Sequence, residues 1–287
     1  MIEWETLETP RELIGELEAR LCEAGIANAR AEAEWLLADT LGMRRTELYL
    51  RDGPVSSAQR EQLQERLSRR LSGEPLQYVL GSCDFFGHRF AVSPGVFIPR
   101  PETETLAELA IEFLRRRAAP TAVGAPWVLE LGTGSGCLAI SLAKAVPTCI
   151  VVAVELSWMA LQVARTNVIT HRVEHRLRLV HTDWTAGIRG TFELIIANPP
   201  YVPSAEVDAR MGDPRQSLDG GPDGMMFHRR TLADAPRLLS AGGALLMECA
   251  EGQALPLRQM GQALPWTKAV RIYEDLAGRP RGLFIES

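Results

Sequence analysis

Apolar residues recur at helical spacing through the N-terminal part of the chain. Leu13, Leu17 and Leu21 stand four residues apart and line one face of a helix. The segment Thr9-Pro10-Arg11-Glu12 precedes them and reads as a capping box with proline at the first helical position. The pattern therefore predicts that the first helix begins here.

Two further helices complete a small bundle. One is expected over Ala29–Thr40, with Trp35 and Leu36 turned inward, and the next begins at Ser56 or Ser57 and carries Leu63, Leu67 and Leu71. We interpret the charged residues of this third helix as a solvated face (Arg60, Glu61, Glu65, Arg66, Arg69 and Arg70). We expect residues 1–75 to form a helical domain that contains no active site, and a docking surface for a macromolecule is the alternative interpretation of its charged face.

The pattern changes between residues 76 and 100. Short apolar runs alternate with Gly87, Pro94 and Gly95, which is typical of a hairpin and a linker. Pro101 then opens a helix that runs to about Arg117, with Glu102 and Glu104 in its first turn, where the helix dipole favours acidic side chains. We place the start of a third segment, the catalytic domain, at residue 101.

From residue 126 onward, apolar strands alternate with helices. Such alternation predicts an α/β fold with a doubly wound, mostly parallel sheet and helices on both faces. The expected strands are 127–131, 150–154, 177–181, 193–197 and 244–248, with helices at 137–145 and 156–169. A closing antiparallel pair is expected at 268–273 and 282–286, so residues 101–287 form one catalytic domain.

The composition narrows the possible partners and the compartment. The net charge is −5, which disfavours a grip on the phosphate backbone of duplex DNA. The five cysteines (Cys22, Cys83, Cys137, Cys149, Cys249) are scattered and favour reduced thiols. MIEWETLE is acidic and lacks the apolar segment of a signal peptide, and no apolar run is long enough to span a bilayer. We expect a cytoplasmic protein without membrane contact, and a monomer.

Polar residues follow the predicted strands at the points where they end. Glu130, Glu155, the pair Asp183-Trp184 and Asn198 all occupy such positions. Ligands of parallel α/β sheets lie outside the carboxyl ends of the strands. The sequence therefore predicts a binding site at this edge of the sheet.

A glycine loop follows the first strand of the predicted sheet. Gly132, Thr133, Gly134, Ser135 and Gly136 form GxGxG, and Cys137 replaces the last glycine of the dinucleotide fingerprint. Glu155 stands where an NAD or an S-adenosyl-L-methionine enzyme would hold two ribose hydroxyls. Glu130 favours S-adenosyl-L-methionine over NAD, because a carboxylate there would repel a pyrophosphate and attract an ammonium or a sulfonium. Trp184, beside Asp183, either covers the adenine or packs in the core.

The strand at 193–197 ends in Asn198-Pro199-Pro200-Tyr201. Neither proline donates a backbone hydrogen bond, and each restricts the residue before it to extended conformations. The Asn198 amide and the Pro199 carbonyl suit a flat group that bears an NH2, and Tyr201 suits stacking on its plane. An ordinary strand followed by a turn is the alternative interpretation. Arg100 is long enough to reach a substrate here or to hold an internal salt bridge.

Taken together, these motifs resemble the release factor glutamine methyltransferases. The resemblance is carried by LELGTGSGCLAISLA, NPPYV, IPRPETE, GGPDGMMFHRR and LLMECAEGQ, and it covers nearly the whole chain. It implies a class I fold and transfer of a methyl group from S-adenosyl-L-methionine to the glutamine side-chain nitrogen in the GGQ motif of peptide-chain release factors. It also implies that Gly132–Gly136, Glu155, Asp183, Trp184 and Asn198 bind this cofactor, and that Asn198, Pro199, Pro200 and Tyr201 bind the glutamine. Glu155 departs from the aspartate usual in the family.

Three alternatives share parts of this pattern. A DNA adenine N6-methyltransferase also presents a flat amine to NPPY, but it would have to flip a base and read a sequence. A sister enzyme would methylate a glutamine of a ribosomal protein with the same cleft. A non-catalytic cofactor-binding module is the third. We expect Asn198, Pro199 and Tyr201 to act by positioning, and the five histidines lack metal-binding spacing such as HExxH, so no metal is expected.

Overall fold

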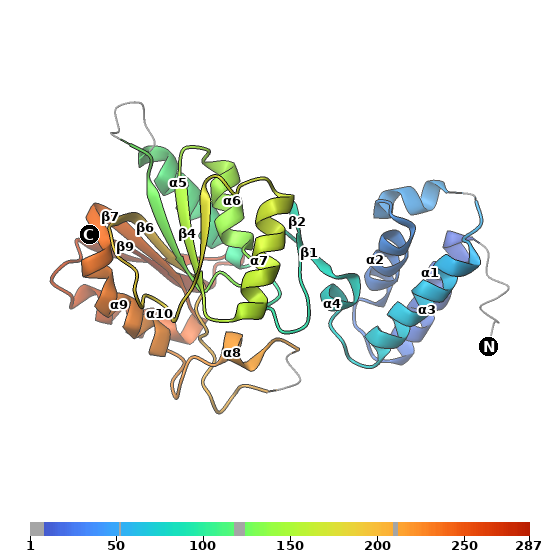
Figure 1. Cartoon of the computed structure of the whole chain (residues 1–287). Coiled ribbons are helices and arrows are strands. Elements are labelled where there is room, and N and C mark those ends of the chain that lie inside the picture. Colours follow the sequence, from blue (N-terminus) through green and yellow to red (C-terminus); the bar gives the residue numbers. More distant parts are fainter. Residues whose placement is uncertain (1–8, 52, 118–123, 209–211) are drawn as a thin grey trace. The chain divides into compact units, whose positions relative to one another are not determined.

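The computed structural model describes residues 9–51, 53–117, 124–208 and 212–287 (Figure 1). MIEWETLE, read above as unlike a signal peptide, lies outside the described residues. The chain divides into two compact units, Met1–Gly81 and Ser82–Ser287. The predicted hairpin and linker segment, residues 76–100, is therefore divided between the two units, with residues 82–100 in the second.

The first unit is a bundle of short helices around a leucine-rich core. It contains α1 (Pro10–Glu23), α2 (Ala29–Leu41), the 3-10 helix η2 (Arg45–Leu50), α3 (Ser57–Leu71) and α4 (Leu76–Leu80). The capping box before α1 is confirmed, because the Thr9 side chain accepts from the Glu12 amide while Glu12 bonds back to Thr9. The three leucines of α1 are completely buried, as their spacing predicts.

Two expectations for this bundle were wrong. Trp35 is only half-buried and lies under the Arg45 guanidinium, whereas its neighbour Glu34 is buried. The α3 face is not simply solvated, since Arg66 pairs with Asp39 at 2.8 Å, and Arg70 pairs with Glu32 at 2.6 Å. Arginine stems pack along apolar surface while their heads find acidic partners on the neighbouring helix, which the charge pattern of one helix cannot reveal.

The second unit is built on a seven-stranded sheet of order β5-β4-β3-β6-β7-β9-β8, which confirms the predicted fold class. The strands from β5 to β7 are parallel, and β9 and β8 continue the sheet antiparallel. Their bounds are β3 Trp127–Leu131, β4 Ile150–Glu155, β5 Leu177–His181, β6 Phe192–Ala197, β7 Leu239–Glu248, β8 Ala269–Glu274 and β9 Pro280–Glu286.

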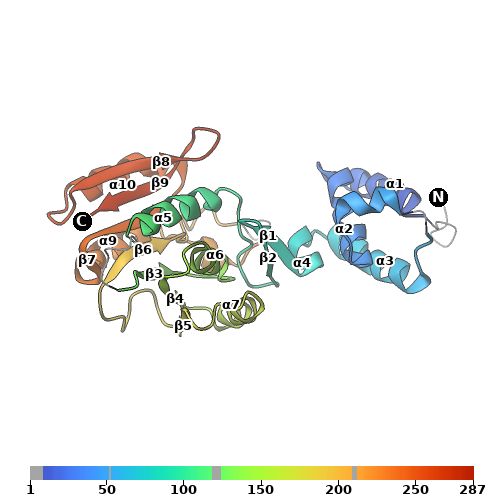
Figure 2. The ribbon, with the colours of Figure 1, turned by 90° about the horizontal axis from the view of Figure 1, so that it is seen from above.

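Helices cover both faces of this sheet (Figures 1 and 2). Strand β6 shows the division, because Leu194 and Ile196 join the core under α5–α7, whereas Ile195 and Ala197 join the core under α9 and α10. The helices are α5 Thr103–Arg117, α6 Cys137–Ala145, α7 Trp158–Thr170, α8 Arg215–Leu218, α9 Met226–Leu238 and α10 Ala254–Gln262, with a 3-10 turn η4 at Glu251–Gln253. Among the described helices, none is long and apolar enough to cross a membrane.

Two helices begin later than predicted. Helix α5 begins at Thr103, after a turn at Pro101-Glu102, and this places the Thr103 side chain at the helix end that faces the site. Helix α7 begins at Trp158 because the Ser157 side chain caps it by accepting from the Ala160 amide.

A hairpin, β1 (Ser82–Phe85) and β2 (His88–Ala91), packs against α7. The buried Asn167 of α7 holds it in place. Its Oδ1 accepts from the Ala91 amide at 2.8 Å, and its Nδ2 donates to the carbonyls of Ala91 and Ser135, at 3.0 and 2.8 Å. One side chain thus links the hairpin, α7 and the glycine loop.

Candidate active site

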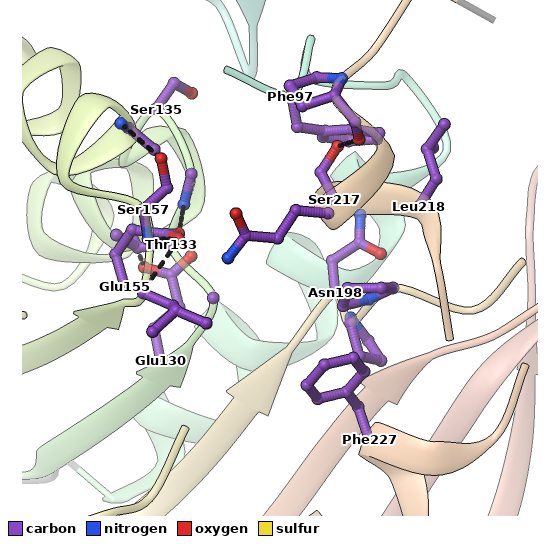
Figure 3. Close-up of a pocket in the computed structure, with 18 of the residues that line it drawn as sticks. Phe97, Glu130, Thr133, Ser135, Glu155, Ser157, Asn198, Ser217, Leu218 and Phe227 are labelled. Atoms are coloured by element: carbon purple, nitrogen blue, oxygen red, sulfur yellow. Dashed lines mark hydrogen bonds between the residues drawn. The ribbon is translucent and has the colours of Figure 1, made fainter. Parts of the chain in front are cut away.

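A pocket lies at the carboxyl ends of β3, β4 and β6 and collects nearly all the predicted site residues (Figure 3). The glycine-loop side, with Glu130, Thr133 and Glu155, faces Asn198 and Phe227 across it. The predicted residues that line it are Arg100, Gly132, Thr133, Gly134, Ser135, Glu155, Asp183, Trp184, Asn198, Pro199, Pro200 and Tyr201. Gly136 was also predicted but does not line the pocket.

The glycine loop is held by the neighbouring strand. The amides of Gly132 and Thr133 both donate to the Val154 carbonyl, at 3.0 and 2.9 Å. Gly132, Gly134 and Gly136 have φ of 73°, 56° and 81°, a region that favours glycine. A Cβ on Gly136 would lie 3.3 Å from both Ala164 and Ile140, so this glycine lets α6 pack against α7 rather than contact a ligand.

The Glu155 carboxylate is oriented by three backbone amides. One oxygen accepts from Gly134 at 2.8 Å, and the other accepts from Leu156 and Ser157 at 2.9 and 2.8 Å. These bonds fix the longer glutamate side chain at the end of β4, directed toward the glycine loop. The oxygen that accepts only from Gly134 retains a lone pair for a further donor such as a ligand hydroxyl.

Glu130 is a buried acid on the floor of the pocket. Only 2% of the residue is exposed, and its partner is the Thr133 hydroxyl, which donates to it. Burial raises the pKa of Glu130 to about 8, and the nearby Glu155 adds to the shift while the Thr133 hydrogen bond opposes it. A buried carboxyl with so raised a pKa is ionised most readily when a cation lies beside it.

Trp184 packs mainly in the core, which is the second of the two interpretations given for it above. Its indole Nε1 donates to the Thr231 hydroxyl at 3.0 Å, and the centroid of its ring lies 4.7 Å from that of the Phe227 ring. A Cβ on Gly132 would touch this indole at 3.4 Å, so Trp184 also supports the glycine loop from below. Asp183 is exposed and pairs with Arg230 at 3.0 Å.

The Asn198 side chain is oriented by a hydrogen bond. Its Nδ2 donates to the Thr103 hydroxyl at 3.0 Å. Within the described part of the chain, neither Asn198 Oδ1 nor the Pro199 carbonyl accepts a hydrogen bond. Two acceptors in consecutive residues are therefore available to a ligand in the pocket.

The Tyr201 ring is held at its far end. Its hydroxyl donates to Glu248 Oε1 at 3.3 Å, and burial, followed by the Glu248 charge, raises the pKa of Tyr201 far above its usual range. The Tyr201 hydroxyl therefore stays protonated, and the ring is left to pack against a ligand.

The GGPDG segment, residues 220–224, closes around residues 198–201, which we call the acceptor loop. The Val202 amide donates to the Leu218 carbonyl at 2.9 Å, and the Gly220 amide donates to the Val202 carbonyl at 2.8 Å. A Cβ on Gly220 would lie 2.7 Å from the Pro200 carbonyl oxygen, and one on Gly224 only 2.2 Å from that of Tyr201. The glycines of this motif are therefore required by close backbone approach.

Arg100 holds an internal ion pair. Its guanidinium pairs with Asp213, whose side chain is almost fully buried and whose Oδ1 also accepts from the Ile98 amide at 2.9 Å. Of the two interpretations of Arg100, this is the salt bridge, although the residue also lines the pocket.

Sequence reasoning overlooked several residues at the site. Thr103 and Phe227 line the pocket, and Glu248 lies directly behind Tyr201. The rule that selected Glu130 and Glu155, a polar residue at the end of a parallel strand, also applies to Glu248 at the end of β7. Thr103 gave no such signal, because its role depends on a contact with Asn198, 95 positions later.

The β3 and β4 side of the pocket fits S-adenosyl-L-methionine. Glu130 suits a cationic group, and Glu155 suits hydroxyls at the end of β4. A Cβ on Gly134 would meet nothing within 4 Å, so this loop backbone stands open to a ligand. The residues present and their chemistry agree with the cofactor that the motifs predicted.

Comparisons with known proteins agree with this geometry. Residues 12–81 match the family model described as PrmC N-terminal domain, and residues 89–213 match that of the Methyltransferase small domain. Among solved structures, a methyltransferase from Pyrococcus furiosus has a TM-score of 0.52 at 21% identity, covering 77% of this chain and 97% of that one. The N-terminal domain of human METTL16 in complex with SAH has a TM-score of 0.53 at 14% identity, covering 82% and 86%. At these identities the likeness concerns the fold alone.

Curated relatives match along most of their length. The release factor glutamine methyltransferase of Geobacter sulfurreducens is 39% identical over 261 residues, which is 88% of each chain. That of Deinococcus radiodurans is 37% identical over 276 residues, covering 94% of this chain and 96% of the relative. That of Bradyrhizobium diazoefficiens is 35% identical over 273 residues, covering 93% and 91%. At this identity and coverage, the chain belongs to the release factor glutamine methyltransferase family.

Proposed function

We propose that this enzyme transfers a methyl group from S-adenosyl-L-methionine to the side-chain amide nitrogen of the glutamine in the GGQ motif of peptide-chain release factors. The observation that carries the proposal is the pair of available acceptors, Asn198 Oδ1 and the Pro199 carbonyl, in the same pocket as the glycine loop. A primary carboxamide has two N–H donors on one nitrogen, and two acceptors side by side match it.

The chemistry requires positioning more than proton abstraction. A carboxamide nitrogen is a poor nucleophile because its lone pair is delocalised into the carbonyl. S-adenosyl-L-methionine, when bound, supplies an electrophilic methyl group. Asn198 and Pro199 each accept one amide hydrogen and so hold the nitrogen in line with the methyl group that is to be transferred. Tyr201 packs on the amide plane and excludes water. Such orientation accounts for about 7–11 kcal/mol of barrier reduction in favourable cases. The nitrogen loses its proton after transfer, when it has become acidic.

We assign the cofactor and substrate roles by side of the pocket. The cofactor residues are Gly132, Thr133, Gly134, Ser135, Glu155, Asp183 and Trp184, with Gly136 acting through packing. Asn198, Pro199, Pro200 and Tyr201 hold the glutamine, and Asn198 also borders the cofactor. Arg100 acts on the substrate indirectly, because its ion pair with Asp213 fixes the pocket wall.

The first unit docks the release factor in this proposal. All residues that line the pocket lie between positions 95 and 227, so the helical bundle contributes none of them. It exposes two large side chains of η2, Tyr49 and Leu50, at 47% and 81%. We infer that the enzyme works as a monomer in the cytoplasm, where the five free cysteines stay reduced.

The test is incubation with S-adenosyl-L-methionine and a purified release factor, followed by peptide mass mapping. We expect one added methyl group on the GGQ glutamine and none on a factor in which that glutamine is alanine. Methylation of a ribosomal protein but of no release factor would transfer the proposal to the sister activity. Methylation of duplex DNA would overturn the glutamine assignment.

A further inference from the structure

The buried Asn167 of α7 binds the glycine loop as well as the hairpin. Only 1% of the residue is exposed. Its Nδ2 donates to the carbonyls of Ser135 and Ala91, at 2.8 and 3.0 Å, and its Oδ1 accepts from the Ala91 amide at 2.8 Å. All three partners are backbone groups, and Ser135 belongs to the loop that lines the cofactor side of the pocket.

The three backbone groups fix the Asn167 carboxamide in one orientation. Two carbonyls need donors and one amide needs an acceptor, and a primary carboxamide offers two N–H donors on its nitrogen and an acceptor on its oxygen. In the flipped orientation, the NH2 group would face the Ala91 amide and the oxygen would face both carbonyls. The bond to Ser135 is buried, so its loss would leave a polar group unpaired away from water.

Helix α7 shapes the second half of the glycine loop. Residues 132–134 are held by acceptors of β4, through backbone and side-chain hydrogen bonds. Ser135 is held by Asn167, and a Cβ on Gly136 would lie 3.3 Å from the side chain of Ala164, one turn earlier on α7. The two α7 residues lie on the same face of the helix, because they are three positions apart. The Asn167 side chain is the polar contact of this face with the loop.

The other partner of Asn167 begins a different part of the pocket wall. Ala91 is the last residue of β2. The chain that follows it contributes four residues to the lining of the pocket, Gly95, Phe97, Pro99 and Arg100. One carboxamide therefore holds the glycine loop and the start of this wall together.

We propose that Asn167 is a positioning residue for S-adenosyl-L-methionine, which holds the Ser135 carbonyl in the loop geometry that the cofactor binds and links that geometry to the hairpin. Asn167 is not among the described residues that line the pocket, so it acts through Ser135. The inference concerns the cofactor and does not depend on the identity of the methyl acceptor.

The experiment is titration calorimetry of the full chain with S-adenosyl-L-methionine, without a methyl acceptor. Asn167→Leu removes all three hydrogen bonds with little change of shape. Asn167→Asp keeps an acceptor for the Ala91 amide but, even when protonated, has one donor for two carbonyls. The matched control is His171→Ala, because His171 Nε2 also ties α7 to the hairpin, by donating to the Arg89 carbonyl at 3.0 Å. Thermal unfolding of each variant reports folding separately.

A second measurement uses the wild-type protein alone and does not require that any variant folds. A ligand that binds the ordered loop also stabilises the contacts that order it, because coupling between two sites is reciprocal. The Ala91 amide donates to Asn167 Oδ1, so its hydrogen exchange reports on this contact. The cofactor should slow this exchange several-fold, and it should leave the exchange unchanged in Asn167→Leu.

We expect the Kd of S-adenosyl-L-methionine to rise about tenfold in Asn167→Leu and Asn167→Asp and to stay within about twofold of wild type in His171→Ala. Wild-type affinity in both Asn167 variants would overturn the proposal. An equal loss of affinity in His171→Ala would also overturn it, by assigning the effect to the attachment of the hairpin. Unchanged exchange of the Ala91 amide in the wild-type protein would refute the link between loop and hairpin. If the wild-type enzyme binds the cofactor as expected but methylates no release factor, the proposed function fails and this inference stands.

Discussion

The carbonyl oxygen of Tyr201 accepts a hydrogen bond from Gln253 Nε2 at 2.8 Å, which ties the acceptor loop to the turn that follows β7. The same Nε2 lies 3.4 Å from the Asp223 carbonyl, so one glutamine side chain binds two loops that meet at Gly224. The position of Tyr201 therefore depends on residues far along the chain, and this dependence can be tested by substituting Gly224.

Gly224→Ala should displace the acceptor loop. The new Cβ would lie 2.2 Å from the Tyr201 carbonyl oxygen and 2.5 Å from Gln253 Nε2, at φ of +73°. We expect a loss of about 1–3 kcal/mol in unfolding free energy and at least a tenfold loss in methyl transfer. The control is Gly278→Ala, which has the same φ of +73° but open space around the added Cβ. Equal losses of methyl transfer in both variants would contradict the role of close approach.

Asn198→Ala should remove an acceptor that matters mainly during transfer. We expect turnover to fall about 10²–10³-fold, the loss typical of removing one oriented polar group from an active site. Binding of S-adenosyl-L-methionine, measured by titration calorimetry, should change far less. Asn198→Asp should be similarly inactive, because a carboxylate beside a cationic cofactor changes the ground state. Near-normal turnover in the alanine variant would rule out the role of Asn198.

Glu130 should make the stability of the cofactor-free protein fall with rising pH. Its pKa is raised from 4.5 to about 8 in the folded state, so the folded protein holds this proton more tightly than the unfolded chain. Stability is then lost as pH rises from about 4.5 to 8 and is constant above. Each pKa unit corresponds to about 1.4 kcal/mol. The difference in unfolding free energy between Glu130→Gln and wild type should therefore be a few kcal/mol more in favour of the variant at pH 9 than at pH 5.

Denaturant unfolding at the two pH values measures this difference for Glu130→Gln, with the exposed Glu108→Gln as control. The same buried acid should release a proton when a cationic ligand binds. Titration of the wild-type enzyme with S-adenosyl-L-methionine at pH 7, in buffers of different ionisation enthalpy, should reveal net proton release. The release should be absent in Glu130→Gln, and its persistence there would assign the proton to another group.

Leu50→Asp should weaken the use of an intact release factor. Leu50 is 81% exposed in the helical unit, and a charge there would oppose an apolar contact with a docked protein. We expect KM for the intact factor to rise about tenfold, with KM for a short GGQ peptide unchanged. Leu276→Asp is the control, since Leu276 is fully exposed in the β8–β9 turn of the other unit. A KM change shared by both substrates would exclude docking through this residue.

The strands and their polar ends were predictable because burial on both faces of a parallel sheet leaves uninterrupted apolar runs. Helices α9 and α10 were missed, since Pro236 lies inside α9 and Pro256 lies in the first turn of α10, and both prolines obscure the helical pattern. The partner of Arg100 stands 113 positions away, and no local pattern encodes such a pairing. The glycines of GGPDG were recognised only as a motif, because the need for them lies in backbone oxygens of another loop.

The enclosure of the acceptor loop also constrains how this enzyme can diversify. Backbone atoms of Gly220 and Gly224 press against Pro200 and Tyr201, so no larger residue can be accommodated there without moving the tetrapeptide. Another part of the pocket wall is lined by residues that carry side chains, namely Phe97, Pro99, Arg100, Pro214, Gln216, Ser217 and Leu218. Evolution or an engineer seeking a different acceptor protein must therefore vary that wall and leave the grip on the amide unchanged.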